Sequence, residues 1–249
     1  MDHPRNRRIH PLAVLAVIAL GLAACSDDGN GNGNGNGNGN GQTSSNGAGN
    51  GVTVDSNGVT DVPSGTLQSQ LDALPKAILT SAESDGLVWM REEEKLAHDV
   101  YVTLGAKWNI KTFDNIAAAE ATHTAAVKAL LDRYGLSDPA AGTAVGVFTN
   151  PDIQLLYATL VAQGSTSMSD ALTVGATIED LDIADLQDRA TPTPDIALVY
   201  TNLEKGSRNH LRAFVKQLAN DGATYTPTHI TQAEYDAIVS SGIERGPTS

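Results

Sequence analysis

In four separate segments of the chain, an apolar residue recurs every three or four positions, and acidic or histidine residues interrupt each series near its middle. The segments span about residues 85–108, 114–134, 169–188 and 194–220. This spacing places the recurring side chains on one face of an α-helix. The interrupting residues are Glu94 in the first segment, Glu120 and His123 in the second, Glu179 and Asp182 in the third, and His210 in the fourth. The sequence therefore predicts an all-α fold with carboxylates and imidazoles facing its interior.

Residues that begin and end helices stand at suitable positions around these segments. Asp114 is a good N-cap for the second helix, and Gly135 is a good stop for it. Pro194 suits the first turn of the fourth helix because its missing N–H is not needed there. These residues support the same four segments.

The connections predict how the four helices are arranged. The five residues 109–113 join the first two segments, and 189–193 join the last two, so each pair forms antiparallel neighbours. The much longer stretch 136–168 separates the pairs and contains a short extra helix at about 151–163. One long crossover between two antiparallel pairs is the arrangement of a ferritin-like four-helix bundle.

The amino terminus indicates export and a lipid anchor. Three arginines precede the apolar run 12–24, which is too short to span a bilayer comfortably. The run ends in Leu22-Ala23-Ala24-Cys25, which resembles the lipobox of bacterial lipoproteins. The alternative is an ordinary signal peptide with an accidental cysteine. We favour lipidation of Cys25, because it also explains why the single cysteine lies here.

Three parts of the chain follow from this prediction. Residues 1–24 are a signal peptide, 25–65 are the lipidated cysteine and a flexible linker, and 66–249 are the folded domain. The linker begins with alternating Gly and Asn at 29–41 and has too little apolar surface to offset its chain entropy. The expected location is the cell envelope, on the periplasmic side, or at the outer membrane of a Gram-negative cell because Ser26 rather than Asp follows the cysteine.

Composition excludes several classes of function. A formal net charge of −13 is unsuited to nucleic acid, whose phosphates require clustered Lys and Arg. No Gly-rich phosphate loop is present, so nucleotide binding has no support. With one cysteine the chain can form neither an internal disulfide nor a thiolate metal cluster.

The interior acids predict a metal centre. Four carboxylates in a low-dielectric core would each cost several kcal/mol or take up a proton. Two divalent cations would balance their charge, and the two histidines would add neutral nitrogen ligands. Glu120 and His123 form a Glu-x-x-His motif, which places both side chains on one helical face. Mixed oxygen and imidazole ligands suit Fe, Mn or Zn better than Ca or Mg, and two iron ions are the first candidate.

These motifs resemble a bacterial and archaeal family of unknown function, numbered 2202, which is similar to ferritins and rubrerythrins. The resemblance covers about Leu79 to Ile238. It is carried by Met90–Tyr101 (MREEEKLAHDVY), Glu120–His123, Gly146–Pro151 (GVFTNP), Ile178–Leu186 (IEDLDIADL) and Gly206–Phe214 (GSRNHLRAF).

The resemblance implies one glutamate on the first helix, Glu-x-x-His on the second, Glu-x-x-Glu on the third and Glu-x-x-His on the fourth. The chain departs from this pattern twice. Asp182 is one methylene shorter than glutamate, and Ser207 replaces the glutamate of the fourth helix. One metal position would then have fewer ligands, unless Glu204, one turn earlier, compensates. The sequence also lacks the cysteine pairs of a rubredoxin-like electron relay.

Other residues have simpler interpretations. Glu92 and Glu93 flank Glu94, so a helix face assigned one residue out of step would expose the proposed ligand. His98 is expected to be solvated. Tyr101 either donates a hydrogen bond to a ligand carboxylate or serves in electron transfer, or it is a core tyrosine with its hydroxyl satisfied, and we favour the core. Trp89 and Trp108 are expected to pack in the interior, and Arg208, Arg212 and Lys216 to form a solvated or ion-paired stripe.

Three functions remain open from the sequence. The first is a di-iron oxidoreductase that oxidises Fe(II) or reduces peroxide. The second is a non-catalytic lipoprotein that binds or buffers metal, and the third is a helical interaction module without metal. The expected partners are metal ions and the membrane that holds the lipid anchor, and a homodimer is compatible with all three.

Overall fold

The computed structural model describes residues 53–54, 60–61 and 64–245, all within one compact unit, Asn50–Ser249. The expected signal peptide, Cys25 and most of the expected linker lie outside the described residues. The described part of the chain is all-helical apart from one short antiparallel pair, β1 (Thr53–Val54) and β2 (Thr60–Asp61), in which Thr53 pairs with Asp61. These strands fall within the stretch expected to be linker.

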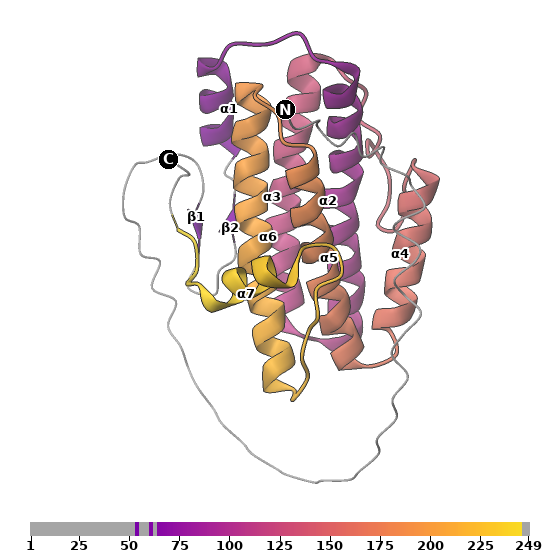
Figure 1. The fold of residues 1–249 in the computed structure, drawn as a ribbon. Coiled ribbons are helices and arrows are strands. Elements are labelled where there is room, and N and C mark those ends of the chain that lie inside the picture. Colours follow the sequence, from indigo (N-terminus) through magenta and orange to yellow (C-terminus); the bar gives the residue numbers. More distant parts are fainter. Residues whose placement is uncertain (1–52, 55–59, 62–63, 246–249) are drawn as a thin grey trace, which may run out of the picture. The chain divides into compact units, whose positions relative to one another are not determined.

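Four long helices lie side by side in the described domain (Figure 1). α2 packs along α3 and α5 packs along α6, while contacts of α3 with α6 and of α2 with α5 join the two pairs. The bounds of these helices are α2 Ser81–Trp108, α3 Lys111–Tyr134, α5 Met168–Asp188 and α6 Pro194–Asn220. The four segments predicted from apolar spacing are therefore the four long helices.

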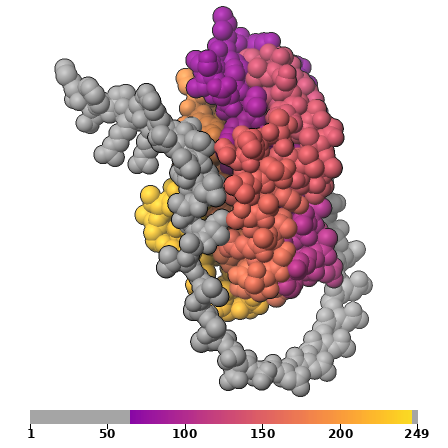
Figure 2. Space-filling view, turned by 90° about the vertical axis from the view of Figure 1, so that its right-hand side faces the viewer, coloured from indigo at the N-terminus to yellow at the C-terminus, as the bar shows by residue number. Residues whose placement is uncertain are grey.

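Three shorter helices complete the described fold: α1 (Ser64–Ala73), α4 (Pro151–Gly164) and α7 (Gln232–Ser240). α4 is the short helix expected within the crossover, and it contacts α2 and α5. Figure 2 shows the crossover and α4, in rose to salmon, covering one face of the long helices. α1 and α7 were not predicted from the sequence. α1 packs against α3, and α7 packs against α6.

The connection between α2 and α3 is shorter than predicted. α3 begins at Lys111 rather than Asp114, with Ile110 as an N-cap that offers no side-chain hydrogen bond. Asn109 adopts a left-handed conformation (φ 54°), which reverses the chain within two residues and lets α3 start three residues early. Gly135 ends α3 in the same left-handed region, as expected (φ 70°).

Where α2 begins, the chain is tied to the connection between α5 and α6. Thr80 and Glu83 form a capping box, in which Thr80 Oγ1 accepts from the Glu83 N–H and Glu83 accepts from the Thr80 N–H. The other oxygen of Glu83 accepts from the hydroxyls of Thr191 (2.6 Å) and Thr193 (2.5 Å). One carboxylate therefore holds two helix ends together.

The crossover is fastened to α2 by buried charged residues of that helix. Arg91 forms a bidentate ion pair with Asp138, at 2.9 and 3.1 Å. The carboxylate of Glu92 accepts hydrogen bonds from the backbone N–H groups of Thr149 (2.5 Å) and Asn150 (3.0 Å). These contacts hold both ends of the segment that precedes α4.

One and two turns further along α2, Lys95 and Asp99 hold the middle of the crossover. Lys95 donates to the carbonyl of Ala144 (2.9 Å), lies over the ring of Phe148 and pairs with Asp99. Asp99 also accepts from the Gly146 N–H (2.8 Å). The charged run that follows Met90 is therefore largely buried, because α3, α4 and α5 surround α2.

Apolar side chains fill the space between the long helices. Tyr101, Phe113 and Phe214 pack against one another with ring centroids 5.2 to 5.9 Å apart. Gly175 on α5 leaves the space that the Phe214 ring occupies, since a Cβ there would clash with the ring. No helix among the described residues is long and apolar enough to cross a bilayer.

Candidate metal centre

All six residues predicted from the sequence as metal ligands lie in the interior, and no more than 7% of any of them is exposed. They come from all four long helices. We call them the metal-candidate cluster: Glu94 on α2, Glu120 and His123 on α3, Glu179 and Asp182 on α5, and His210 on α6.

Helical spacing directs these side chains inward. Glu120 and His123 lie one turn apart on α3, and the apolar residues Ile116 and Val127, which flank them on the same face, are fully buried. The apolar series on each helix continues on both sides of its polar residues. Packing of the apolar neighbours therefore carries the acids and imidazoles into the core.

Glu120 lies at the centre of the cluster. Its Oε2 is 3.0 Å from Nδ1 of His123, and its Oε1 is 2.7 Å from Nδ1 of His210. Each histidine then faces a second acid. The distance from His123 Nδ1 to Glu94 Oε2 is 3.5 Å, and that from His210 Nδ1 to Glu179 Oε2 is 3.6 Å. The geometry consists of two half-sites, each with one histidine and one glutamate, that share the carboxylate of Glu120.

Several buried polar atoms of this cluster have no hydrogen-bond partner. The 2.7 Å contact between Glu120 and His210 is close enough for an ion pair but lacks the geometry of a hydrogen bond. The unpartnered atoms are Glu94 Oε1, Glu120 Oε1, His123 Nε2, Asp182 Oδ1 and both ring nitrogens of His210. A buried unpaired polar atom typically costs about 1–3 kcal/mol of stability. So many of them in one place are consistent with a bound metal ion that these side chains would coordinate.

The donor atoms are close enough to share an ion. One atom from each of Glu120, His123 and His210 lies within 4.8 Å of the other two, so this buried trio could hold a metal ion. The two imidazole rings are stacked, with centroids 5.4 Å apart and planes 20° apart. Carboxylate and imidazole donors in this combination suit iron, manganese or zinc.

Burial and mutual repulsion shift the pKa values of the acids. Burial raises the pKa of Glu94 to about 7, although the neighbouring His123 partly offsets this. Burial and the nearby charge of Glu94 likewise raise the pKa of Asp182 well above its usual value. Burial also acts on Glu120, but His123 and His210 outweigh it and hold the pKa of Glu120 below its usual range.

The pKa values of the two histidines are also raised, but the cause is the neighbouring negative charge and not burial. Burial alone would lower the pKa of His210, but the charges of Glu179 and Glu120 outweigh it and raise the pKa to about 9. The pKa of His123 is raised for the same reason, with Glu120 as the main opposing charge. Without a cation, this core balances its charges by holding protons that metal ions would displace.

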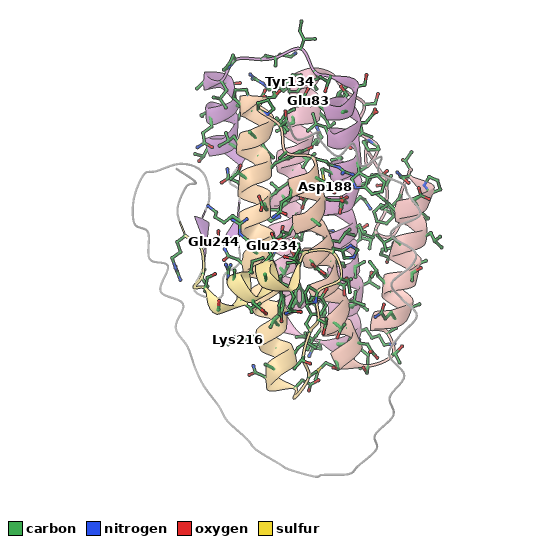
Figure 3. The ribbon with its side chains drawn as sticks, viewed as in Figure 1. Glu83, Tyr134, Asp188, Lys216, Glu234 and Glu244 are labelled. Atoms are coloured by element: carbon green, nitrogen blue, oxygen red, sulfur yellow. The ribbon has the colours of Figure 1, made fainter. Side chains whose placement is uncertain are left out.

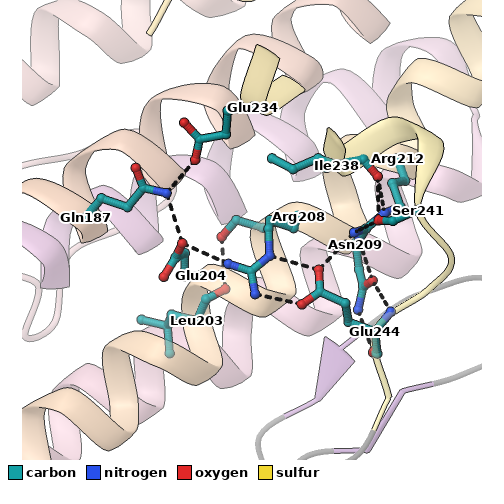
Figure 4. A network of polar contacts seen from close by, with 11 residues as sticks. Gln187, Leu203, Glu204, Arg208, Asn209, Arg212, Glu234, Ile238, Ser241 and Glu244 are labelled. Carbon is teal, nitrogen blue, oxygen red and sulfur yellow. Dashed lines mark hydrogen bonds and ion pairs between the residues drawn. The ribbon is translucent and has the colours of Figure 1, made fainter. Parts of the chain in front are cut away.

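Asp182 differs from the other acids because a side chain orients it. The Ser207 hydroxyl donates to Asp182 Oδ2 and also to the backbone carbonyl of Leu203. Asp182 Oδ1 is left without a partner. Glu204 does not take the place of the missing glutamate, because it pairs with Arg208 at 2.8 Å and accepts from Gln187 on the outer side of α6, as Figure 4 shows.

Tyr101 contacts the cluster directly. Its hydroxyl donates to Glu179 Oε1 at 2.6 Å, while its ring belongs to the aromatic group with Phe113 and Phe214. Two of the alternatives considered for Tyr101 therefore hold, since it is a core tyrosine and also donates to a cluster acid. His98 is half-buried and contacts Asp99, away from the cluster.

Sequence reasoning missed a second polar group beside Glu94. Glu93 is buried, and the indole N–H of Trp89 donates to Glu93 Oε2 (2.6 Å) and to Asp185 Oδ2 (2.9 Å). Arg189 pairs with Asp185 at 3.3 Å and lies over the Trp89 ring. Burial, followed by the charges of Asp185 and Asp182, raises the pKa of Glu93 well above its usual value. The acidic run at 92–94 was a signal of this group, but only a helix enclosed on several sides buries all three members.

Asp180 is the other buried acid that the sequence did not reveal. It is fully buried, and its carboxylate accepts hydrogen bonds from the segment before α7. We call this group the Asp180 anchor. Its donors are Tyr225 Oη (2.8 Å), the Thr228 N–H (2.6 Å) and hydroxyl (3.2 Å), the His229 N–H (3.0 Å) and the Ile230 N–H (2.9 Å).

The sequence of the helical domain matches a known family. Residues 83–242 match the family described as an uncharacterized protein domain, DUF2202, and the chain belongs to this family. The uncharacterized protein MJ0754 of Methanocaldococcus jannaschii is 53% identical over 178 residues, which are 71% of this chain and 96% of that protein. The crystal structure of the hypothetical protein MJ0754 is similar with a TM-score of 0.68 at 54% identity, covering 69% of this chain and 99% of that one. Neither name states an activity.

Proposed function

We propose that this protein is an exported, lipid-anchored, ferritin-like protein whose four long helices hold a carboxylate–histidine metal centre. The observation that carries the proposal is the set of buried, unpartnered oxygen and nitrogen atoms that converge from α2, α3, α5 and α6. Hydrophobic residues could have filled this space at lower cost, because buried charged groups without partners destabilise a fold. A bound cation is the simplest compensation for retaining them.

The arrangement favours a dinuclear centre. Glu120 offers one oxygen to the half-site of His123 and Glu94, and the other to the half-site of His210 and Glu179. The four cluster acids, ionised, carry a charge of −4, which two divalent cations would balance. Two iron ions are our first candidate, with manganese or zinc as alternatives of the same ligand preference.

The proposed activity is the oxidation of Fe(II) or the reduction of peroxide. Two ferrous ions would supply the two electrons that convert hydrogen peroxide and two protons into two water molecules. The chain's own residues would position the acids and exclude bulk water. Tyr101 donates to Glu179, and Ser207 donates to Asp182, so both carboxylates of α5 are oriented by neutral donors.

Metal analysis of protein folded in the cell tests the binding part of the proposal. We expect wild-type protein to be purified with iron, manganese or zinc, and Glu120→Gln and His123→Ala each to lose most of it. Glu204→Gln is the matched control, because Glu204 is an acid on α6 that faces Arg208 instead of the cluster. Equal metal content in all four proteins would reject the proposed centre.

The redox part has a separate test. Metal-free protein would be loaded with Fe(II) under anaerobic conditions and mixed with oxygen or hydrogen peroxide. We expect iron oxidation faster than in buffer, and loss of that rate in Glu120→Gln. A rate equal to that of buffer with both oxidants, in protein that retains its metal, would reject catalysis but leave metal binding intact.

A non-catalytic metal-binding protein is the second candidate, and Ser207 favours it. Its hydroxyl is engaged with Asp182 and the Leu203 carbonyl, so α6 offers His210 as its only cluster ligand. This candidate predicts stoichiometric metal and a higher melting temperature without turnover. The helical interaction module predicts neither.

The lipid anchor requires its own experiment, because Cys25 lies outside the described residues. We expect labelled palmitate to be incorporated into the full-length protein in the cell and the protein to fractionate with membranes. Cys25→Ala should lose both properties. A Cys25→Ala protein that still fractionates with membranes and still carries label would exclude lipidation at this residue.

A further inference from the structure

A cavity of about 360 Å³ lies between the beginning of α3 and the second half of α6, and none of the six cluster residues lines it. We call it the α3–α6 pocket. Its polar lining consists of Lys111, Thr112 and Asn115 from α3, and Asn209, Arg212, Lys216 and Gln217 from α6. Figure 3 labels Lys216, which projects from α6.

The lining is positively charged although the whole chain carries a formal net charge of −13. It includes three cationic side chains and no acidic one. Lys111 and Lys216 are exposed at its rim, and neither forms an ion pair with any residue that the structure describes. In the described domain, every arginine from Arg91 to Arg212 pairs with an acid, whereas Lys111 and Lys216, like Lys76 and Lys107, do not.

Arg212 forms a fixed wall of the pocket. Its guanidinium donates to the Ile238 carbonyl (2.8 Å), to Asn209 Oδ1 (2.9 Å) and to Glu244 (2.8 Å), contacts that Figure 4 shows together. Arg208 pairs with Glu204 and Glu244, so the positive charges of the two arginines are balanced by the two glutamates. The uncompensated charge of the pocket therefore belongs to the two lysines.

The start of α3 adds partial positive charge beside the pocket, although Asp114 lies in the same turn and the Phe113 N–H already donates to the Ile110 carbonyl. Its N-cap residue, Ile110, has no side-chain oxygen to accept a hydrogen bond from the first turn. The N–H groups of a helix's first turn carry partial positive charge and bind anions when no cap satisfies them. Thr112, Asn115 and Gln217 provide further hydrogen-bonding groups around the same space.

The pocket also has an apolar part, formed by Ile116, Ala213 and Ile243. Inorganic phosphate or sulfate has no carbon to place against these side chains. An organic anion can bury its carbon chain there and direct its charged ends to the lysines. The volume admits a small dicarboxylate or tricarboxylate.

We propose that the α3–α6 pocket binds a small organic anion with two or three carboxylate groups, held by Lys111 and Lys216. Arg212 closes one side of the pocket, and the apolar part accommodates the carbon chain. The site does not use the metal-candidate cluster, so it stands whether or not the protein binds metal.

Calorimetric titration of the full domain with succinate, tricarballylate and inorganic phosphate at low ionic strength tests this proposal. These carboxylates are chosen because they chelate metal weakly. We expect saturable binding of at least one carboxylate, with weaker or no binding of phosphate. The double variant Lys111→Gln and Lys216→Gln should bind the carboxylate with an affinity lower by about tenfold or more.

Lys128→Gln is the matched control, since Lys128 is also on α3 but pairs with Asp132 outside the pocket, and it should bind like wild type. Unchanged thermal melting of the double variant would establish that it is folded. If it unfolds, the single Lys216→Gln variant and amide chemical shifts of Lys111 and Thr112 during titration replace it. Absence of saturable carboxylate binding, equal affinity in the lysine variants, or tighter binding of phosphate would each overturn the proposal.

Discussion

Asp180 and Asp182 are buried acids two residues apart on α5, and their carboxylates differ in how far hydrogen bonds compensate for burial. Asp180 is fully buried, and its two oxygens accept five hydrogen bonds from the segment before α7. Asp182 is also buried, but one of its oxygens has no partner and its nearest charges are other acids. A buried carboxylate therefore does not by itself indicate a metal. The proposed metal centre depends on unpartnered atoms that converge from several helices.

The Asp180 anchor and the metal-candidate cluster also differ in whether the chain itself supplies every hydrogen-bond partner. The Asp180 anchor is complete within the chain, since backbone and hydroxyl donors from Tyr225 to Ile230 surround the carboxylate. The metal-candidate cluster is incomplete, because its acids and histidines leave atoms unpaired even after contacting one another. We expect substitutions in the two groups to respond differently to added metal.

The largest effect is expected from Asp180→Ala. Removing the acceptor leaves several buried donors unpaired, so the free energy of unfolding should fall by about 3–5 kcal/mol. The loss should be the same with metal and with chelator, as measured by urea unfolding. A loss of stability that disappears when metal is added would place Asp180 in the metal centre and contradict its role as a purely structural anchor.

Asp182→Asn should have a different signature. In metal-free protein, burial and the charge of Glu94 raise the pKa of this carboxyl and disfavour its ionised form, so a neutral amide should change stability by about 0.5 kcal/mol or less. With metal at a hundredfold excess over the dissociation constant, wild type should gain about 2.7 kcal/mol, and the variant should gain clearly less. Melting with and without chelator measures both values. Equal gains would remove Asp182 from the site.

Tyr101→Phe tests the link between the aromatic core and the cluster. The substitution removes the hydrogen bond to Glu179 but keeps the ring against Phe113 and Phe214. We expect a loss of about 1 kcal/mol in unfolding experiments and retained metal. If Fe(II) oxidation slows while metal content is unchanged, Tyr101 positions Glu179 for the reaction. Loss of metal would instead make the hydrogen bond necessary for binding.

A modest, pH-dependent effect is expected at Glu83, a carboxylate that accepts hydrogen bonds from its own helix end and from the connection between α5 and α6. Hydrogen bonds from Thr191, Thr193 and Thr80 lower its pKa from 4.5 to about 2. Because the folded-state pKa is below the unfolded one, the ionised form stabilises the fold above about pH 4.5, and this contribution is lost as the pH falls through about 2. Glu83→Gln should cost about 1 kcal/mol at pH 7 and much less at pH 2. A cost independent of pH would contradict the assignment.

Much of the cluster could be predicted because its residues follow helical spacing. Glu94, Glu120, His123, Glu179, Asp182 and His210 each replace an apolar residue in a regular series, and all are buried. The long helices followed from the same pattern. The start of α3 did not, since Asn109 reverses the chain by a left-handed conformation that its neighbours do not reveal.

Residues outside the series could not be assigned in the same way. Asp180 and Glu93 lie off the predicted faces, and they are buried because the segment before α7 and the Trp89–Asp185 group cover those faces. α1 and α7 were missed because neither continues a long apolar series. Local spacing therefore identified the faces between the long helices, but it did not identify faces that other elements cover.

The contacts between α2 and the crossover have a consequence for any attempt to move the cluster into another scaffold. Glu92 holds the backbone of the crossover, Glu93 meets Trp89, and Glu94 faces His123, so three consecutive residues serve three surroundings. Rotating the helix by one residue, about 100°, would exchange all three assignments. The direction in which Glu94 points is therefore determined partly by residues 136–150, which bind the neighbouring Glu92. A minimal transplant of four helices without residues 136–150 would carry the ligand types but lack the contacts that aim one of them.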